Sequence, residues 1–457
     1  MVRWAAFLLI GALSVCLAVS PGWAMPRFGR PGTYAVDGAP IGVSAAAIDG
    51  QAGRDLVTAN EAGAAGPSLS LLFNRGQGSF FPEERMSVNA KYNVQAVTSG
   101  DFDADGLDDL ALAVDDISVF PLRASVLIYH NNGSGFAAPV EVKLSGFFPR
   151  AIAAADVTGD GVLDLTVAHA QTGTHGAGLV SVLAGQKNGT TPTGVFSVVD
   201  TMAVGSAPTT LSVADVDGDG HADVALADPD GGRVYLLYGT GSIADVLAAP
   251  IELMAVTAPI AALIDVLPGD ALPQVLVGTQ SGGKLLRFAQ TAPRQFAAPA
   301  EQRIALLPVT MGLAELTGDD VDDLVVLSAL GAELWNGAAD GTFSFGESLL
   351  HDDTLDTLTL ADLNGDAKVD VAASATTQDR VTVVLNGADV PFTPSPTATV
   401  APTPTPSGAC AGDCNGDGQV SISELVQGVN IALGSAAVGS CTAFDRDGNG
   451  QVAVDEL

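Results

Sequence analysis

The chain has 457 residues, of which 52 are acidic and 19 are basic, so its formal net charge is −33. A surface this acidic argues against nucleic acid and against anionic membranes as partners, because both need basic residues to neutralise phosphates. Hydrophobic residues make up 47% of the chain, which is enough for a large core, and the length allows two or more domains.

Residues 1–24 are predicted to be a secretory signal peptide. One Arg precedes an apolar run, and the small residues Gly22 and Ala24 lie where cleavage would occur. A retained membrane anchor is the alternative interpretation. No later segment is long and apolar enough to span a bilayer, so we expect no membrane insertion after signal removal and a secreted or cell-surface location.

A unit of about 50 residues recurs seven times over residues 33–390. Each copy contains a short apolar strand, an acidic loop, a second strand such as DVALA at 223–227, a third strand and a less regular fourth. Four short strands per 50 residues is the size of a propeller blade, so the sequence predicts an all-β, seven-bladed β-propeller. The loops begin at residues 47, 101, 156, 215, 265, 315 and 362.

The seventh unit ends after its third strand, near Gly387, whereas a spare strand-like segment, GTYAVDG at 32–38, precedes the first loop. We expect this segment to supply the missing fourth strand of the seventh blade. Such a closure would join the two ends of the ring and hide its sheet edges.

Five of the loops carry oxygen-bearing side chains at alternate positions, which is typical of calcium sites. Positions 1, 3, 5 and 9 would offer side chains and position 7 a backbone carbonyl, while position 6 makes the sharp turn. A solvated acidic turn is the alternative, and magnesium is the weaker metal candidate. The loops at Ala47 and Asp265 lack too many oxygens, and we expect no ion there. The predicted ligands are Asp101, Asp103, Asp105, Leu107 and Asp109; Asp156, Thr158, Asp160, Val162 and Asp164; Asp215, Asp217, Asp219, His221 and Asp223; Glu315, Thr317, Asp319, Val321 and Asp323; and Asp362, Asn364, Asp366, Lys368 and Asp370.

The seven units resemble the FG-GAP, or VCBS-type, repeats of integrin α-subunit propellers. That family carries the D-x-D-x-D-G-x-x-D loop between the first two strands of each blade, and an aromatic–Gly and Ala-Pro turn that GFAAP at 135–139 matches. The resemblance implies a seven-bladed propeller with calcium held in the blade hairpins. Its calcium roles extend only to the five intact loops.

Residues 391–409 alternate Pro and Thr and are predicted to form a semi-rigid linker. Residues 410–457 contain two further acidic loops, each with Glu at position 12 as in an EF-hand. Neither has an entering helix, so the pair resembles a dockerin type I module, with a cohesin-like partner implied. Dockerins mostly have Asp at position 12, and we expect this module to be truncated at Leu457. The predicted ligands are Asp413, Asn415, Asp417, Gln419 and Glu424, and Asp445, Asp447, Asn449, Gln451 and Glu456.

About seven Ca²⁺ ions are thus expected, and two functions remain open. The first is a secreted or cell-surface adhesion or interaction module that binds a protein or a glycan, with calcium mainly structural. The alternative is an extracellular polysaccharide-degrading enzyme, or a cellulosome-like component that docks through its C-terminal module. We recognise no catalytic constellation, because neither G-x-S-x-G nor H-E-x-x-H occurs. Pairing among Cys410, Cys414 and Cys441 stays open.

Overall fold

The computed structural model describes residues 28–51, 53–63, 66–170, 177–266, 272–304, 307–351 and 354–387, with residues 427, 429–432, 435–437 and 441. The chain divides into two compact units, residues 1–392 and 393–457. The predicted signal peptide, the Pro/Thr linker and both C-terminal acidic loops lie outside the described residues. In the second unit, Cys441 is buried and disulfide-bonded.

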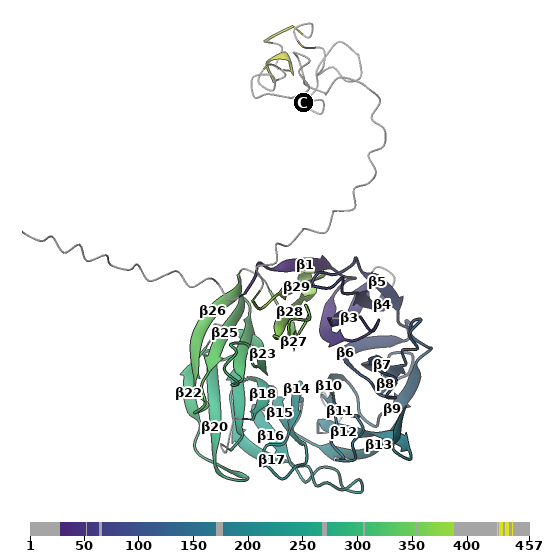
Figure 1. Ribbon diagram of the computed structural model, residues 1–457, viewed down its shortest axis with the longest axis vertical. Coiled ribbons are helices and arrows are strands. Elements are labelled where there is room, and N and C mark those ends of the chain that lie inside the picture. The colour runs from purple at the N-terminus through teal and green to yellow at the C-terminus, as the bar shows by residue number, and fades with distance from the viewer. Residues whose placement is uncertain are drawn as a thin grey trace, which may run out of the picture. The chain divides into compact units, whose positions relative to one another are not determined.

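The first unit is a seven-bladed β-propeller, as the repeats predicted (Figure 1). Each blade is an antiparallel sheet whose first strand lies nearest the centre of the ring. Blades one to three comprise β2 (Pro40–Ala46), β3 (Asp55–Gly63), β4 (Gly66–Leu72) and β5 (Glu84–Ser87); β6 (Tyr92–Gly100), β7 (Asp109–Asp116), β8 (Arg123–Tyr129) and β9 (Val140–Lys143); and β10 (Pro149–Ala155), β11 (Asp164–His169), β12 (Leu179–Asn188) and β13 (Thr191–Ala203).

Blades four to seven continue the same order, and in blade five two short strands both pair with β20. They comprise β14 (Thr210–Ala214), β15 (Asp223–Asp228), β16 (Arg233–Leu237) and β17 (Ile251–Ala255); β18 (Pro259–Asp265), β19 (Gln274–Thr279), β20 (Lys284–Ala292), β21 (Gln295–Phe296) and β22 (Ala300–Arg303); β23 (Pro308–Ala314), β24 (Asp323–Ser328), β25 (Gly331–Gly337) and β26 (Phe343–His351); and β27 (Thr357–Ala361), β28 (Asp370–Ala375), β29 (Arg380–Val384) and β1 (Gly32–Ala35), with a 3₁₀ turn at Thr376–Gln378.

The hydrophobic core lies between the blades. Seven clusters of buried side chains occupy the seven interfaces between neighbouring blades, including the one between blades seven and one. Every residue of β11, β15, β19, β24 and β28 is buried, because a neighbouring blade covers each face of the second strand. This explains why the sequences of these strands contain unbroken apolar runs such as VALA instead of alternating apolar and polar residues.

Backbone pairing corrects the position of the fifth unit. In blade four, Ala214 at the end of the first strand pairs with Asp223 at the start of the second. In blade five the corresponding pair is Asp265 with Gln274. Asp265 is therefore the last residue of β18 rather than the first of the loop, and the unit begins one residue later than the sequence pattern indicated.

The predicted closure of the ring is confirmed. Strand β1 pairs antiparallel with β29, with Thr33 opposite Thr382, and the two lie side by side in Figure 1. The contact extends to Phe28, ahead of the predicted start of the propeller, through a bridge to Asn386. Tyr34 packs edge-on against Phe80 of blade one at 5.1 Å between ring centroids. The N-terminal strand thus joins blade seven to blade one.

Replacing Tyr34 with Ala should destabilise the propeller by about 2 kcal/mol, because a half-buried ring in the closing strand is lost. Thermal or urea unfolding measures the change. Thr33→Ala is the matched control, since Thr33 is an exposed neighbour on the same strand and should change stability by less than about 0.5 kcal/mol. Equal stability of the two variants would contradict a closing role for β1.

His169 at the end of β11 is fully buried, and its Nε2 lies 3.1 Å from the Ser181 hydroxyl oxygen. Burial lowers the pKa of this imidazole from 6.5 to about 4. In the folded protein His169 therefore stays neutral at a pH where the unfolded chain already takes up a proton. The stability contributed by the neutral ring is complete above about pH 6.5 and is lost as the pH falls towards 4.

The free energy of unfolding should consequently fall by about 3 kcal/mol between pH 7 and pH 4 through this one group. In His169→Gln, where an amide can keep the bond to Ser181, this part of the acid sensitivity should disappear. Urea unfolding across the pH range measures it. His351→Gln removes an exposed histidine and should leave the profile of the unmodified chain unchanged.

Candidate metal centres

A buried aspartate at loop position 9 begins the second strand of six blades. In blade four, one carboxylate oxygen of Asp223 accepts the N–H of Val216, the second residue of the loop, at 2.7 Å. The other oxygen accepts the N–H of Gly239, beyond the end of the third strand, also at 2.7 Å. The same pair of bonds recurs at Asp55, Asp109, Asp164, Asp323 and Asp370, all at most 1% exposed.

Position 9 therefore has a structural role that the sequence analysis missed. Asp55 has this structural role in blade one, where most of the other acidic positions are lost. Its retention there is the feature of the sequence that could have indicated the role. Burial raises the pKa of these carboxyl groups, to about 6 at Asp223 and about 7 at Asp370, against the opposing effect of the two N–H donors. Each such aspartate joins the loop, the second strand and the end of the third strand.

The remaining carboxylates of each loop organise the loop itself. In blade two, Asp101 accepts the N–H groups of Asp105 and Gly106 at 3.0 Å each, and Asp105 accepts that of Leu107 at 2.9 Å. Position 6 is left-handed in all five loops, including the two where it is not Gly. Its φ is +64° at Asp320 and +65° at Ala367, so the turn that the sequence predicted forms with these residues as well.

Side-chain oxygens converge in these loops. One oxygen each of Asp101, Asp103 and Asp105 lie within 4.8 Å of one another, and so do single oxygens of Asp215, Asp217 and Asp223. The predicted carbonyl ligands at position 7 directly follow the left-handed turn in the sequence. They are Leu107, Val162, His221, Val321 and Lys368.

Two threonine hydroxyls test whether these loops suit a cation. Thr158 and Thr317 hold position 3 in blades three and six, and their hydroxyl oxygens are buried. Neither makes a hydrogen bond of good geometry, but each lies close enough to the position 9 carboxylate of its own loop, Asp164 or Asp323, to lower the pKa of that carboxyl. Together with carboxylates of the same loops, these oxygens form the hard donor set that calcium prefers.

In blade two a histidine joins the cluster. His130, at the end of the third strand, places Nδ1 at 3.4 Å from a carboxylate oxygen of Asp109 and lies within 4.8 Å of Asp103 and Asp109. His130 is not among the ligands that the sequence predicts. Its neighbourhood depends on the packing of β8 against the loop and has no signal in the repeat pattern.

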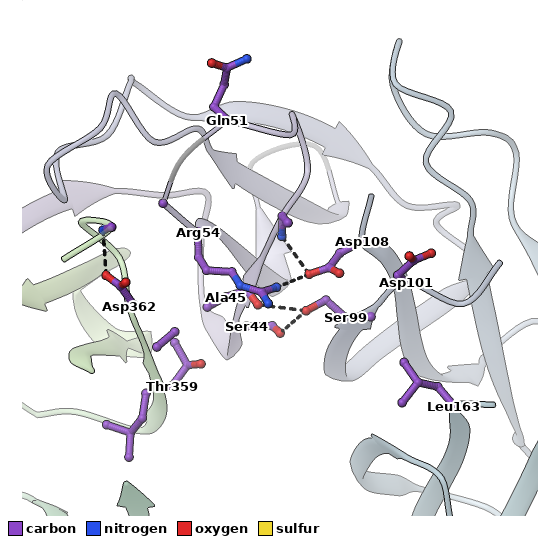
Figure 2. Close-up of a pocket in the computed structure, with 16 residues that line it drawn as sticks. Ser44, Ala45, Gln51, Arg54, Ser99, Asp101, Asp108, Leu163, Thr359 and Asp362 are labelled. Carbon is purple, nitrogen blue, oxygen red and sulfur yellow. Dashed lines mark hydrogen bonds and ion pairs between the residues drawn. The ribbon is translucent and has the colours of Figure 1, made fainter. Parts of the chain in front are cut away.

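The loop of blade one keeps Asp49 and Asp55 but has no acid at positions 1 and 5, and it carries Arg54 directly before Asp55. Its Nη1 lies 2.5 Å from the Asp108 carboxylate of blade two, which also accepts the N–H of Ala47 at 2.8 Å. This pair lines a cavity of about 810 Å³, with Asp101 and Asp362 on either side (Figure 2). The loops of blades seven, one and two thus meet at one end of the central channel.

Amide side chains connect the loops to the following blade. Asn131 of blade two donates to the carbonyl of Ile48, at loop position 2 of blade one, at 2.8 Å. The same bond joins Asn74 to Leu363, Asn386 to Leu316 and Gln290 to Val216. Four loops are therefore hydrogen-bonded across a blade interface. Each asparagine is the second residue after its third strand, as in "FNR" and "LNG", which is the signal that sequence analysis could have used.

The ten predicted metal ligands of the C-terminal module lie outside the described residues. These are Asp413, Asn415, Asp417, Gln419, Glu424, Asp445, Asp447, Asn449, Gln451 and Glu456. Their role stays a prediction.

Comparison with known proteins supports the repeats. Residues 207–237 match the FG-GAP repeat model, and residues 362–422 match the FG-GAP-like repeat model. These segments contain the loops of blades four and seven. No curated protein sequence matches the chain. Within the described residues, no helix has the length and apolar character needed to cross a membrane.

Among solved structures, the chain is similar to BBS1N, crystallised in complex with ARL6DN and soaked with lead. The two share 14% sequence identity with a TM-score of 0.53, over 79% of this chain and 97% of that chain. At this identity the likeness concerns the fold alone. The chain therefore carries FG-GAP repeats on a seven-bladed propeller.

The two roles within a loop can be separated in calcium-free buffer. Asp370→Ala leaves two buried backbone N–H groups without an acceptor and should destabilise the propeller by about 3 kcal/mol or more. Asp366→Ala removes an exposed carboxylate from the same loop and should cost less than about 1 kcal/mol. Urea unfolding in the presence of a chelator compares them, and a larger loss for Asp366→Ala would contradict the structural role of position 9.

Proposed function

We propose that this protein is a secreted or cell-surface β-propeller that acts as an interaction module, binding an extracellular protein or glycan, with calcium in a mainly structural role. The observation that carries the calcium proposal is the convergence of side-chain oxygens in the loops. The buried hydroxyls of Thr158 and Thr317 lie beside the position 9 carboxylates of their loops, and three carboxylates of blade two offer oxygens within 4.8 Å of one another. Five propeller loops would each hold one Ca²⁺. With the two C-terminal loops, the proposed total is about seven.

The interaction role is supported by the type of fold and by the cavity at the end of the channel. FG-GAP propellers suggest interaction modules, and the similar solved structure is itself a complex with another protein. The Arg54 side chain at this cavity is 47% exposed and stands between acidic loops. Calcium in the flanking loops would reduce the local negative charge, so ligand binding at this end should depend on calcium. For the C-terminal module we propose a cohesin-like partner.

Chelation should lower the melting temperature of the full chain. A site that binds only the folded state stabilises it by about 2.7 kcal/mol at a calcium concentration one hundred times its Kd. Removing the ions also leaves the clustered carboxylates of each loop to repel one another. Calorimetry with excess chelator, followed by restoration with calcium, measures the effect. Magnesium at the same concentration is the control and should restore less of the lost stability. An unchanged melting temperature would contradict the calcium proposal.

A glycan array and a pull-down from extracellular material, each with and without calcium, test the interaction role. We expect retention of a ligand only in the presence of calcium, and its loss in Arg54→Ala if the channel cavity is the site. Reducing-end assays on a panel of polysaccharides test the alternative, and turnover of any of them would favour the enzyme.

A further inference from the structure

Arg294 of blade five reaches the acidic loop of blade four. It lies in the turn between β20 and β21, and its guanidinium bonds the carboxylates of Asp217 and Asp219. The Nη2–Oδ2 distance to Asp219 is 3.0 Å. Asp217 and Asp219 hold positions 3 and 5 of this loop, so one side chain occupies oxygens of two proposed calcium ligands.

The position of Arg294 is fixed from several sides. Its guanidinium lies over the ring of Tyr238 of blade four at 4.4 Å from the centroid. Its backbone, with a φ of +61°, donates an N–H to the Gln290 side chain at 2.8 Å. The amide nitrogen of Gln290 in turn donates to the carbonyls of Val216 and Pro273, at 2.5 and 2.8 Å. The turn of blade five is therefore attached to the loop of blade four by both side chains.

The other loops differ at the same positions. In blades three and six the position 3 oxygen, from Thr158 or Thr317, is an uncharged hydroxyl buried beside the position 9 carboxylate of its own loop. In blade three Lys187 contacts only position 5, with Nζ at 3.1 Å from the Asp160 carboxylate. In blade four the position 3 carboxylate of Asp217 is 2% exposed and is already neutralised by Arg294. A planar guanidinium that bridges two carboxylates fits this site better than a lysine would.

We propose that Arg294 is an internal counter-ion that competes with calcium for the loop of blade four. A guanidinium and a Ca²⁺ ion cannot share the same inward oxygens, so calcium binds here only when Arg294 leaves. The loop of blade four then has the lowest calcium affinity of the five, and its occupancy is linked to the conformation of the β20–β21 turn. This inference rests on the proposed function, because it assumes that the other loops bind calcium.

Calcium titration of the full chain by calorimetry and equilibrium dialysis tests the competition. Arg294→Gln removes the charge and should increase the calcium affinity of one site by about tenfold or more. In the unmodified chain that affinity is reduced because calcium must first break the charge-assisted hydrogen bonds of Arg294. Arg294→Lys keeps the positive charge without the planar guanidinium and should give an intermediate calcium affinity. It provides the test if Arg294→Gln fails to fold. Arg233→Gln is the matched control, because Arg233 pairs with Glu252 in blade four, away from the loop.

Hydrogen exchange gives a readout that does not depend on counting ions. In the unmodified chain, exchange in the turn at residues 291–296 should accelerate only at calcium concentrations that fill the weakest site. In Arg294→Gln it should be fast throughout. Adding Asp219→Asn to Arg294→Gln should abolish the tightened site and so assign it to blade four.

The outcomes separate this inference from the proposed function. Calcium binding by the unmodified chain with no change in any site of Arg294→Gln would overturn the competition alone. A hydrogen-exchange rate in the turn that does not change with calcium concentration would also overturn it. Absence of calcium binding by both proteins would overturn the proposed function itself.

Discussion

The buried carboxylate at loop position 9 is the interaction on which six of the seven blades depend. Both of its oxygens accept backbone N–H groups, one from the loop and one from beyond the third strand, as at Asp223. These donors would otherwise be buried without partners, because neighbouring blades exclude water from both faces of the second strand. The carboxylate therefore sets where the loop leaves the first strand. It does so in blade one as well, where Asp55 remains although the acids at positions 1 and 5 have been lost.

Contacts between blades use the same loops. Apolar side chains fill each interface, and amide bonds such as Asn131 to Ile48 attach a loop to the blade that follows it. Cationic side chains appear at these joints too. Arg54 pairs with Asp108 across the joint of blades one and two, and Arg294 pairs with Asp217 across that of blades four and five. The acidic loops are thus local turns and inter-blade connectors at once.

Much of the fold could be predicted because its signals are local and repeated. The seven strand–loop–strand units, the turn at position 6 and the spare strand at 32–38 each follow from patterns a few residues long. The exception is blade five, where Asp265 looks like a loop ligand but pairs with Gln274 as the end of β18. Glutamine takes the place of the aspartate there, and only backbone register reveals the one-residue shift.

The sequence by itself determined the repeat number, the strand order, the means of closure and the acidic positions of five loops. These depend on the alternation of side chains and on turn chemistry within about ten residues of chain. The tertiary structure decided what those acids do. Arg294 and Asp217 are 77 residues apart, and Arg54 and Asp108 are 54 apart, so their pairing exists only once the blades pack. Burial then divides the carboxylates into those that hold backbone groups, those neutralised by a cation of the next blade and those for which we propose a calcium ion.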